Sequence, residues 1–337
     1  MNLNHDQIPE IALAWHRAGK GAVLATVVQT WGSAPRPVGS QLVVSGEAEI
    51  MGSVSGGCVE SAVVAEALDR LESGTCTILE FGVSDDDAFA VGLACGGTIR
   101  IMVEPIGVGS GMPEEVLAQV VEAREARQAL AVETDTGAWT RRMFEYADRA
   151  DAFDADKPGF DDETRFLWIS NPPLRLAIVG AVHIAQPLAE MAKLTGYDVL
   201  IIDPREAFAS EARFPGHRLS HDWPDEALDA CGLDHRTALV TLTHDPKIDD
   251  PAIQTALRSP VFYIGALGSK RTHGKRITRL SDLGFTEAEI ARIDAPIGAD
   301  IGSKSPSEIA VSVMAELTER LRRPRTRPGL APTEAAA

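Results

Sequence analysis

The chain is short of three things: cysteine, aromatic residues and long apolar runs. Of its 337 residues, four are cysteines and 5% are aromatic. No apolar run approaches the roughly 20 residues that a helix needs to span a bilayer. Residues 1–10 are polar and lack the basic and then apolar layout of a signal peptide. We therefore expect a cytoplasmic protein with no membrane contact, whose cysteines remain reduced.

Positive charge is also scarce. Lys and Arg number 32 against 49 Asp and Glu, which gives a net charge of −17. Because binding to nucleic acid depends on clustered Lys and Arg side chains, this balance argues against a nucleic-acid partner. One strongly basic stretch, residues 320–327, leads into a terminal segment rich in Pro and Ala. We predict that residues 322–337 form a disordered tail.

The length of the chain exceeds one ordinary hydrophobic core, so two domains are expected. In the first part, apolar residues recur at helical spacing over residues 8–18 and 59–71. Apolar runs that are β-branched or alternating indicate strands at 22–29, 41–45, 50–54, 75–81 and 98–103. We predict a mixed α/β module over residues 1–107. Residues 108–173 are interpreted as a helical and extended connecting region that ends in a peripheral hairpin or extension.

Strands and helices alternate regularly from Leu174 onward. Short apolar runs indicate strands at 175–179, 198–202, 238–242 and 261–264. Helical patterns lie at 184–195, 251–257, 270–283, 286–293 and 306–321. This alternation predicts a parallel, doubly wound sheet over residues 174–321. The expected fold class is α/β, with an N-terminal mixed α/β module followed by a Rossmann-like domain.

The most informative motif is Ser55-Gly56-Gly57-Cys58, which precedes a predicted helix. A thiol in the first turn of a helix faces the positive end of the helix dipole, which lowers its pKa. Gly56 and Gly57 can adopt conformations closed to other residues and so form a turn that holds an anion. The alternative is a small cysteine packed at the helix start, and the motif alone does not decide between the two.

A second motif, Cys95-Gly96-Gly97, leads into a predicted strand. No helix dipole activates Cys95, so by itself it favours a structural role, and its interest lies in its similarity to the first motif. The two cysteines do not form a CxxC pair, which argues against a thiol redox protein. The only histidines before the second domain are His5 and His16, which argues against a four-ligand structural zinc site in this part of the chain.

A third candidate is Arg36, in a Gly- and Pro-rich loop after the strand at 22–29. An arginine in such a loop can bind phosphate through two parallel hydrogen bonds. A surface arginine in an ordinary turn is the commoner interpretation.

In the second part, Gly180 to Ala185 follows a strand and opens a helix, and Asp203 closes the next strand. This is the position of a dinucleotide-binding fingerprint, with the acidic residue on the ribose. Val182 stands where the second glycine belongs and would crowd a pyrophosphate. The pattern therefore supports the fold more strongly than it supports a nucleotide.

Two histidines lie where ligands bind in open α/β folds. His183 at a helix start and His244 after another strand are both expected at the carboxyl edge of the sheet. Both also fit ordinary loop residues. The segment Gly265 to Arg271 is a further strand, glycine loop and helix start with basic residues, and it is a candidate anion site.

Taken together, these motifs resemble the XdhC/CoxI family, the accessory factors of xanthine dehydrogenase and related molybdenum hydroxylases. In the first part the similar segments are Gly32-Ser33-Ala34-Pro35-Arg36, Gly52 to Glu60, and Cys95-Gly96-Gly97 with Val103-Glu104-Pro105. In the second part they are 180–185, 203–205, 243–245, 263–265, 268–271 and 295–302. One departure is Val182, because the family motif usually reads Gly-x-Gly-His.

The resemblance implies a chaperone that binds the molybdenum cofactor (molybdopterin), protects it while a cysteine desulfurase adds sulfur, and delivers it to an apo molybdenum hydroxylase. Cys58 and Cys95 match the glycine-flanked cysteines of the family and are implied to contact the cofactor, since thiolates suit a soft metal–sulfur centre. A homodimer is expected. The main alternative is an NAD(P)-dependent oxidoreductase that uses the Rossmann-like domain, with Asp203 on the ribose.

Overall fold

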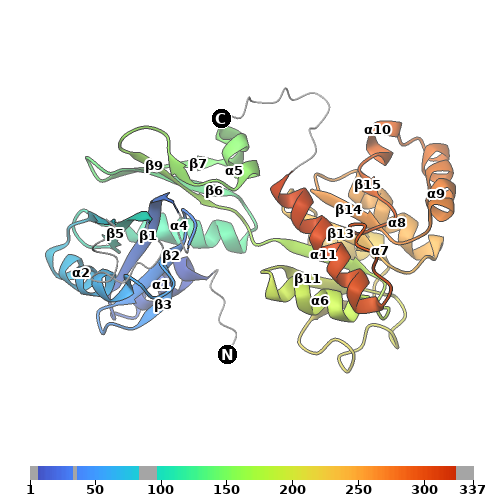
Figure 1. The fold of residues 1–337 in the computed structure, drawn as a ribbon, viewed down its shortest axis with the longest axis horizontal. Helices are drawn as coiled ribbons and strands as arrows, with labels where there is room; N and C mark the ends of the chain where they lie inside the picture. The colour runs from blue at the N-terminus through green and yellow to red at the C-terminus, as the bar shows by residue number, and fades with distance from the viewer. Residues whose placement is uncertain (1–6, 33–35, 83–96, 324–337) are drawn as a thin grey trace. The chain divides into compact units, whose positions relative to one another are not determined.

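The structure is a computed structural model, and it describes residues 7–32, 36–82 and 97–323. The chain divides into two compact units, Met1–Pro172 and Pro173–Ala337. Figure 1 colours the chain from the N-terminus to the C-terminus, and each unit is considered by itself below. The predicted disordered tail lies outside the described residues, apart from its first two.

The first unit contains a five-stranded sheet in the order β3-β2-β1-β5-β4, in which all neighbouring strands are antiparallel. Its strands are β1 (Ala22–Trp31), β2 (Gln41–Ser45), β3 (Ile50–Gly52), β4 (Thr77–Phe81) and β5 (Thr98–Pro105). These five strands and the helices beside them confirm the predicted mixed α/β character of this part of the chain.

Both faces of this sheet are covered, which explains why β1 is mostly apolar and is buried without a break from Ala22 to Val28. Val23, Ala25 and Val27 pack with α2 (Glu60–Ser73) on one face. Residues of the opposite parity, such as Leu24, pack with α1 (Ile8–Arg17) and α4 (Glu114–Glu125) on the other. A half-buried strand would alternate apolar and polar residues, whereas a strand buried on both sides does not.

The region that we interpreted as connecting forms a second, four-stranded antiparallel sheet in the order β7-β6-β9-β8. Its elements are β6 (Leu130–Asp135), β7 (Thr140–Glu145), the 3-10 turn η1 (Tyr146–Asp148), α5 (Ala150–Ala155), β8 (Gly159–Phe160) and β9 (Arg165–Ser170). Val132, Phe166 and Trp168 join the same core as α1 and α4. Residues 130–170 are thus part of the first unit and help to bury its large sheet.

The second unit has a six-stranded sheet in which every neighbouring pair is parallel. Its spatial order is β12-β11-β10-β13-β14-β15, which is the Rossmann order 3-2-1-4-5-6. The strands are β10 (Arg175–Val179), β11 (Asp198–Ile202), β12 (Arg218–Ser220), β13 (Thr237–Thr241), β14 (Tyr263–Ala266) and β15 (Ile293–Asp294). The predicted doubly wound fold is confirmed.

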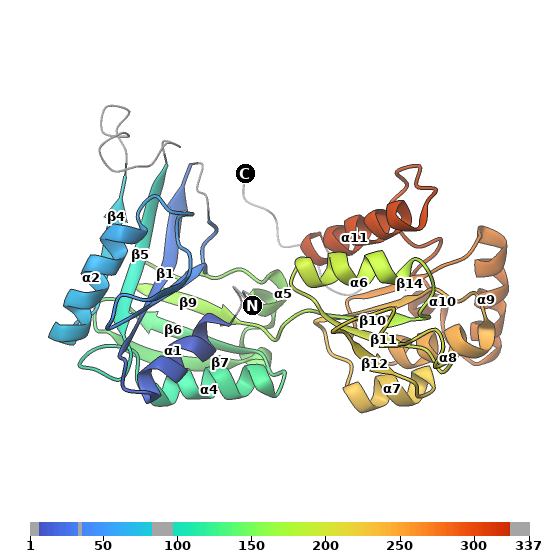
Figure 2. The same ribbon diagram turned by 90° about the horizontal axis from the view of Figure 1, so that it is seen from below.

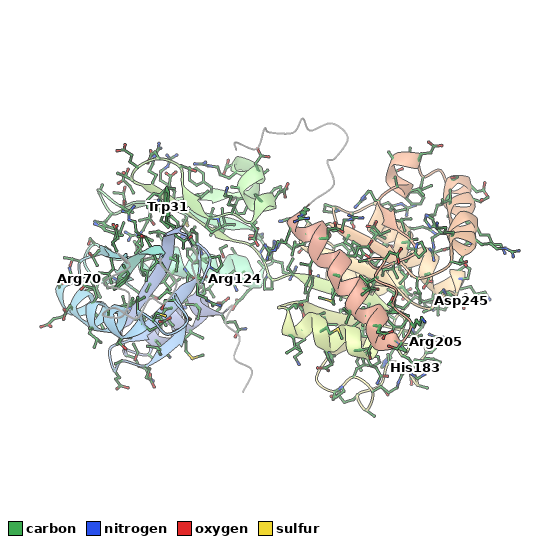
Figure 3. The ribbon with its side chains drawn as sticks, in the orientation of Figure 1. Trp31, Arg70, Arg124, His183, Arg205 and Asp245 are labelled. Carbon is green, nitrogen blue, oxygen red and sulfur yellow. The ribbon has the colours of Figure 1, made fainter. Side chains whose placement is uncertain are left out.

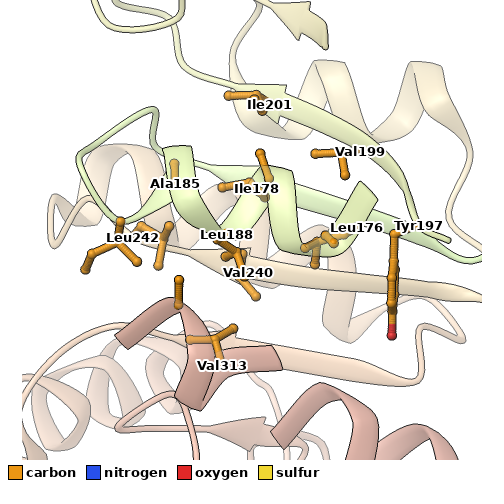
Figure 4. Packing of buried hydrophobic residues seen from close by; sticks show 14 of the residues in the cluster. Leu176, Ile178, Ala185, Leu188, Tyr197, Val199, Ile201, Val240, Leu242 and Val313 are labelled. Carbon is orange, nitrogen blue, oxygen red and sulfur yellow. The ribbon is translucent and has the colours of Figure 1, made fainter. Parts of the chain in front are cut away.

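Helices cover both faces of the parallel sheet, as Figure 2 shows. On one face lie α6 (Ala185–Leu194) and α11 (Pro306–Arg322), whose apolar side chains pack on alternate residues of β10 in Figure 4. On the other face lie α7 (Pro224–Cys231) and α8 (Pro246–Leu257), with parts of α9 (Lys270–Asp282) and α10 (Glu287–Ile290). Helix α11 begins with the Ser305 and Glu308 capping box that its sequence indicates. In the described part of the chain, no helix is long and apolar enough to cross a membrane.

Candidate functional site

Three of the predicted motifs leave the five-stranded sheet at the same end. Strand β1 ends at Trp31, which lies opposite Thr98 at the start of β5. Strand β3 ends at Gly52, beside the start of β2. Arg36, the loop with Cys58 and Gly97, which directly precedes β5, therefore lie towards this end of the sheet. We call it the thiol edge; its described residues are Trp31, Arg36, Ser53 to Val59 and Gly97.

The thiol edge is tied together by Arg36, whose Nε donates a hydrogen bond to the Ser53 carbonyl at 3.3 Å. Gly97 is buried immediately before β5. Cys95 and Gly96 lie outside the described residues, so their predicted contact with a cofactor stays a prediction. The structure does bring the Arg36 loop against the glycine turn that precedes Cys58.

The glycine turn before Cys58 holds an anion, but the anion is the side chain of Glu60. Glu60 Oε1 accepts hydrogen bonds from the Ser53 hydroxyl at 2.7 Å and from the Ser55 backbone N–H at 2.9 Å. Its Oε2 accepts from the Gly57 N–H at 2.8 Å and from the Ser55 hydroxyl. Burial alone raises the pKa of Glu60, but the Ser55 and Ser53 hydroxyls and the Ser55 N–H outweigh it and lower the pKa from 4.5 to about 2.

This arrangement corrects the prediction for Cys58. Helix α2 begins at Glu60 with Val59 as N-cap, so Cys58 precedes the helix and does not lie in its first turn. The carboxylate of Glu60, at the first helical position, takes the place of the anion that the helix dipole and the glycine turn favour. Gly56 and Gly57 do adopt positive φ angles, of 75° and 115°, as a turn of this kind requires.

Cys58 is the exposed thiol among the described cysteines, whereas Cys76 is buried and Cys231 is half-buried. The space beside it is open, because a Cβ atom added to Gly57 would meet no other atom within 4 Å. Cys76 has a structural setting, with its Sγ 3.3 Å from the Ser110 carbonyl oxygen. A ligand can therefore reach the Cys58 sulfur and the backbone beside it.

Trp31 at the thiol edge was not singled out from the sequence. It is the last residue of β1, and its side chain is 75% exposed. Large aromatic side chains in soluble proteins are mostly buried, and an exposed indole offers a flat surface on which a planar ring can stack. Its signal in the sequence was a tryptophan at the boundary between an apolar run and a glycine loop.

In the second unit, β10 and β13 are the neighbours at which the strand order reverses, and ligands bind at this point in Rossmann folds. Gly180 after β10 has a φ of 101°, and a Cβ added there would lie 2.5 Å from Thr243 Cγ2. The glycine is needed for close packing between the two loops. It leaves little space beside its own backbone for a pyrophosphate.

Asp203, the predicted ribose ligand, is fully buried and has hydrogen-bond partners within the protein. Its Oδ2 accepts the Ala181 N–H at 2.9 Å, and both of its oxygens accept hydrogen bonds from Arg205 at 2.7 and 2.8 Å. Burial raises the pKa of Asp203, but these bonds outweigh it and hold the pKa below its usual range. The carboxylate closes the glycine loop with the same kind of contact that Glu60 makes in the first unit.

His183 and His244 are both exposed and follow the neighbouring strands β10 and β13. Figure 3 shows His183 at the same edge of this unit as Arg205 and Asp245. The backbone of His244 is left-handed, with a φ of 64°, and its N–H donates to Asp249 Oδ2 at 3.0 Å. Such a backbone costs free energy, and residues held in it are found preferentially at functional sites.

The fold and the site define a class of protein: a module with an exposed, glycine-flanked thiol, followed by a Rossmann-like unit. Residues 15–82 match the model of the XdhC and CoxI family, and residues 176–317 match that of the XdhC Rossmann domain. Together with the relatives below, these matches show that the chain belongs to the XdhC/CoxI family.

Two relatives match along most of their length. The molybdenum cofactor insertion chaperone PaoD of Escherichia coli (strain K12) is 33% identical over 321 residues, covering 93% of this chain and 88% of its own. A Bacillus subtilis (strain 168) protein, named as a probable xanthine dehydrogenase subunit, is 28% identical over 316 residues, covering 90% and 94%. A solved Bacillus halodurans protein, titled a xanthine dehydrogenase, shares the fold with a TM-score of 0.72 at 21% identity, covering 94% of this chain and 96% of its own.

Proposed function

We propose that this protein is a chaperone that binds the molybdenum cofactor, protects it during sulfuration by a cysteine desulfurase, and delivers it to an apo molybdenum hydroxylase of the xanthine dehydrogenase or CO dehydrogenase type. The observation that carries the proposal is the likeness, over nearly the whole chain, to a protein named as a molybdenum cofactor insertion chaperone. The thiol edge supports it with a chemistry that suits this cargo.

Cys58 is the group that we expect to contact the metal. A cysteine thiolate is a soft donor and suits a molybdenum centre that also carries sulfur ligands. Cys58 is exposed, and the space beside Gly57 is open within 4 Å of an added Cβ atom, so a ligand can approach the turn from this side. The bound cofactor would supply the redox chemistry of its eventual host enzyme; this protein would hold and shield it.

Two further side chains at the thiol edge suit the rest of such a cargo. Trp31 offers an exposed aromatic face on which a flat heterocycle can stack, a contact that contributes roughly 1–3 kcal/mol per ring in other proteins. Arg36 brings a cationic side chain to the same turn. Glu60 has a positioning role, because its carboxylate holds the turn in the shape that presents Cys58.

Cofactor retention tests the proposal. The full-length protein would be purified from a host that makes the cofactor, and its pterin content measured by the fluorescence of the oxidised pterin. We expect Cys58→Ser to lower the pterin content at least about tenfold, the effect of losing roughly 1.4 kcal/mol of binding. Cys231→Ser, which changes a half-buried thiol of the second unit, is the matched control and should retain the pterin.

Delivery is tested separately. Protein loaded with cofactor would be mixed with a purified apo hydroxylase, with and without a cysteine desulfurase, and hydroxylase activity followed. We expect activation by the wild type that needs the desulfurase and is lost with Cys58→Ser. If Cys58→Ser retains the pterin and activates the client as well as the wild type, the role given to Cys58 is wrong.

The alternative, an NAD(P)-dependent oxidoreductase, finds less support at the β10 loop. Asp203 is committed to Ala181 and Arg205, and Gly180 packs against Thr243. Tight binding of NAD(H) with hydride transfer, in protein that carries no pterin, would favour the oxidoreductase and contradict the chaperone proposal.

A further inference from the structure

A basic cavity of about 240 Å³ lies in the second unit between α8 and α9, at the carboxyl ends of β13 and β14. Its lining combines the basic side chains of Arg271, Lys275, Arg276 and Arg279 with the carboxylates of Asp249 and Asp250, and is completed by His244, Pro246 and Thr272. Helix α9 begins after the glycine turn at Gly268, in the segment that the sequence marks as a candidate anion site. None of its lining residues belongs to the β10 loop, where a dinucleotide fingerprint would place its phosphates.

The floor of the cavity contains a buried guanidinium with unmet hydrogen-bond donors. Arg276 is 2% exposed, and its Nε and Nη1 have no hydrogen-bond partner among the residues that the structure describes. The nearest carboxylate oxygens, of Asp249 and Asp250, are 3.8 and 3.9 Å away, beyond hydrogen-bond distance. The two carboxylates lie near the charge without satisfying these donors, and unmet donors on a buried guanidinium cost free energy that a bound anion would offset.

The two neighbouring carboxylates are engaged elsewhere. Asp249 accepts the Thr243 hydroxyl at 2.7 Å and the N–H of His244 at 3.0 Å. Asp250 accepts two hydrogen bonds from Arg279, at 2.5 and 3.0 Å. These bonds leave Arg276 as the cation in the floor of the cavity that has donors to spare.

The rim of the cavity adds positive charge. Arg271 and Lys275 are exposed on α9 and form no ion pair within the described part of the chain. Ser269 caps this 13-residue helix by accepting the Thr272 N–H, and the positive end of the helix dipole faces the same side. These positive charges favour an anion that contacts Arg276 inside the cavity and Arg271 and Lys275 at its opening.

The volume of the cavity limits how much of a ligand it can enclose. Sites for whole drug-sized ligands span about 300–1,000 Å³, so this cavity is too small for a nucleotide or a pterin as a whole. It suits the charged end of such a molecule. Arginine forks match phosphate oxygens through paired hydrogen bonds, and lysine adds a point charge.

We propose that this cavity binds a phosphate or pyrophosphate group of a small molecule, with Arg276 gripping it from below and Arg271 and Lys275 from the rim. The group belongs either to the pterin cargo or to a free nucleotide, since both carry the same anionic chemistry. This inference does not rest on the proposed function, and either can fail alone.

Calorimetric titration of the full-length protein with inorganic pyrophosphate tests the site. We expect binding by the wild type, and at least about a tenfold weaker affinity in a double variant with Arg271→Gln and Lys275→Gln, which lacks two charged contacts. Lys193→Gln, an equally exposed lysine on α6, is the matched control and should bind like the wild type. Both changes lie on the surface, so the double variant should remain folded.

Three results would overturn the proposal: no binding by the wild type at millimolar pyrophosphate, equal affinity in the double variant, or an equal loss in Lys193→Gln. The last would mark a general response to surface charge. Two further measurements on the double variant identify the source of the phosphate. A reduced content of copurified pterin assigns the cavity to the cargo, whereas weaker binding of adenosine diphosphate with unchanged pterin assigns it to a free nucleotide.

Discussion

The two glycine turns of this protein, Ser53 to Glu60 in the first unit and Gly180 to Ile184 in the second, have one feature in common and differ in another. In both, a carboxylate of the protein accepts hydrogen bonds from the backbone N–H groups of the turn, Glu60 in the first and Asp203 in the second. They differ in the space beside them: the first has open space and the exposed thiol of Cys58, whereas Gly180 in the second packs against Thr243 and the exposed side chain is that of His183.

The comparison shows how to interpret an acidic residue near a glycine turn. In both turns the pattern of glycine and acid is the one expected of a ligand site, yet the acid has a partner within the protein. A ligand can bind only to the groups of the turn that internal hydrogen bonds and packing leave accessible. In the first turn an exposed thiol remains, and in the second an exposed imidazole, His183, remains beside backbone that is packed against Thr243.

The largest effect is expected from adding a methyl group to each turn. In Gly180→Ala the new Cβ atom lies 2.5 Å from Thr243 Cγ2 at a φ of 101°, so strain and overpacking together cost about 3 kcal/mol of unfolding free energy. In Gly57→Ala the φ of 115° is strained but the space is open, and the cost is about 1 kcal/mol. Urea unfolding followed by circular dichroism measures both, and equal losses would show that the second turn is as open as the first.

A smaller effect is expected when the internal anion of the first turn is neutralised. Glu60→Gln should lower the free energy of unfolding by about 1–2 kcal/mol at pH 7, a value discounted for partial solvent exposure. The folded pKa of about 2 lies below the ordinary 4.5, so this contribution is present above pH 4.5 and is lost as the pH falls towards 2. The gap between wild type and variant should therefore close over this window.

The control for that experiment is Glu66→Gln on the same helix. Glu66 forms a surface ion pair with Arg70 four residues on, at 2.8 Å, and such pairs contribute about 0.3–0.5 kcal/mol. A loss in Glu66→Gln as large as that in Glu60→Gln would mean that the glycine turn gives its carboxylate no special stabilisation.

The smallest effect on stability, and the clearest on reactivity, concerns the thiols. Cys58→Ser should change the free energy of unfolding by less than about 0.5 kcal/mol because the side chain is exposed.

Iodoacetamide at neutral pH should alkylate Cys58 well before Cys76, whose pKa is raised by burial and by nearby Glu104. Peptide mass spectrometry gives the order, and prior reaction at Cys76 would contradict an accessible thiol edge.

Much of the fold could be predicted because its signals are local. The apolar run of β1, the alternation of strands and helices after Leu174 and the capping box at Ser305 each depend on neighbouring residues, and each is observed. The short elements α7, β12 and β15 were missed, since a few residues carry too little periodicity. The sheet over residues 130–170 was interpreted as a connection because the burial of its strands depends on contacts with other elements, α1 and α4 on one side and α5 on the other.

For the site, the sequence by itself determined which residue types were present at the strand ends: the glycine-flanked Cys58, Arg36, His183, Asp203 and His244. The tertiary structure decided which partner each of these side chains has, because a hydrogen bond forms only between a donor and an acceptor that the folded chain brings together. Folding placed the protein's own carboxylates in both glycine turns, left Cys58 exposed, and buried Arg276 at the basic cavity with two donors unmet.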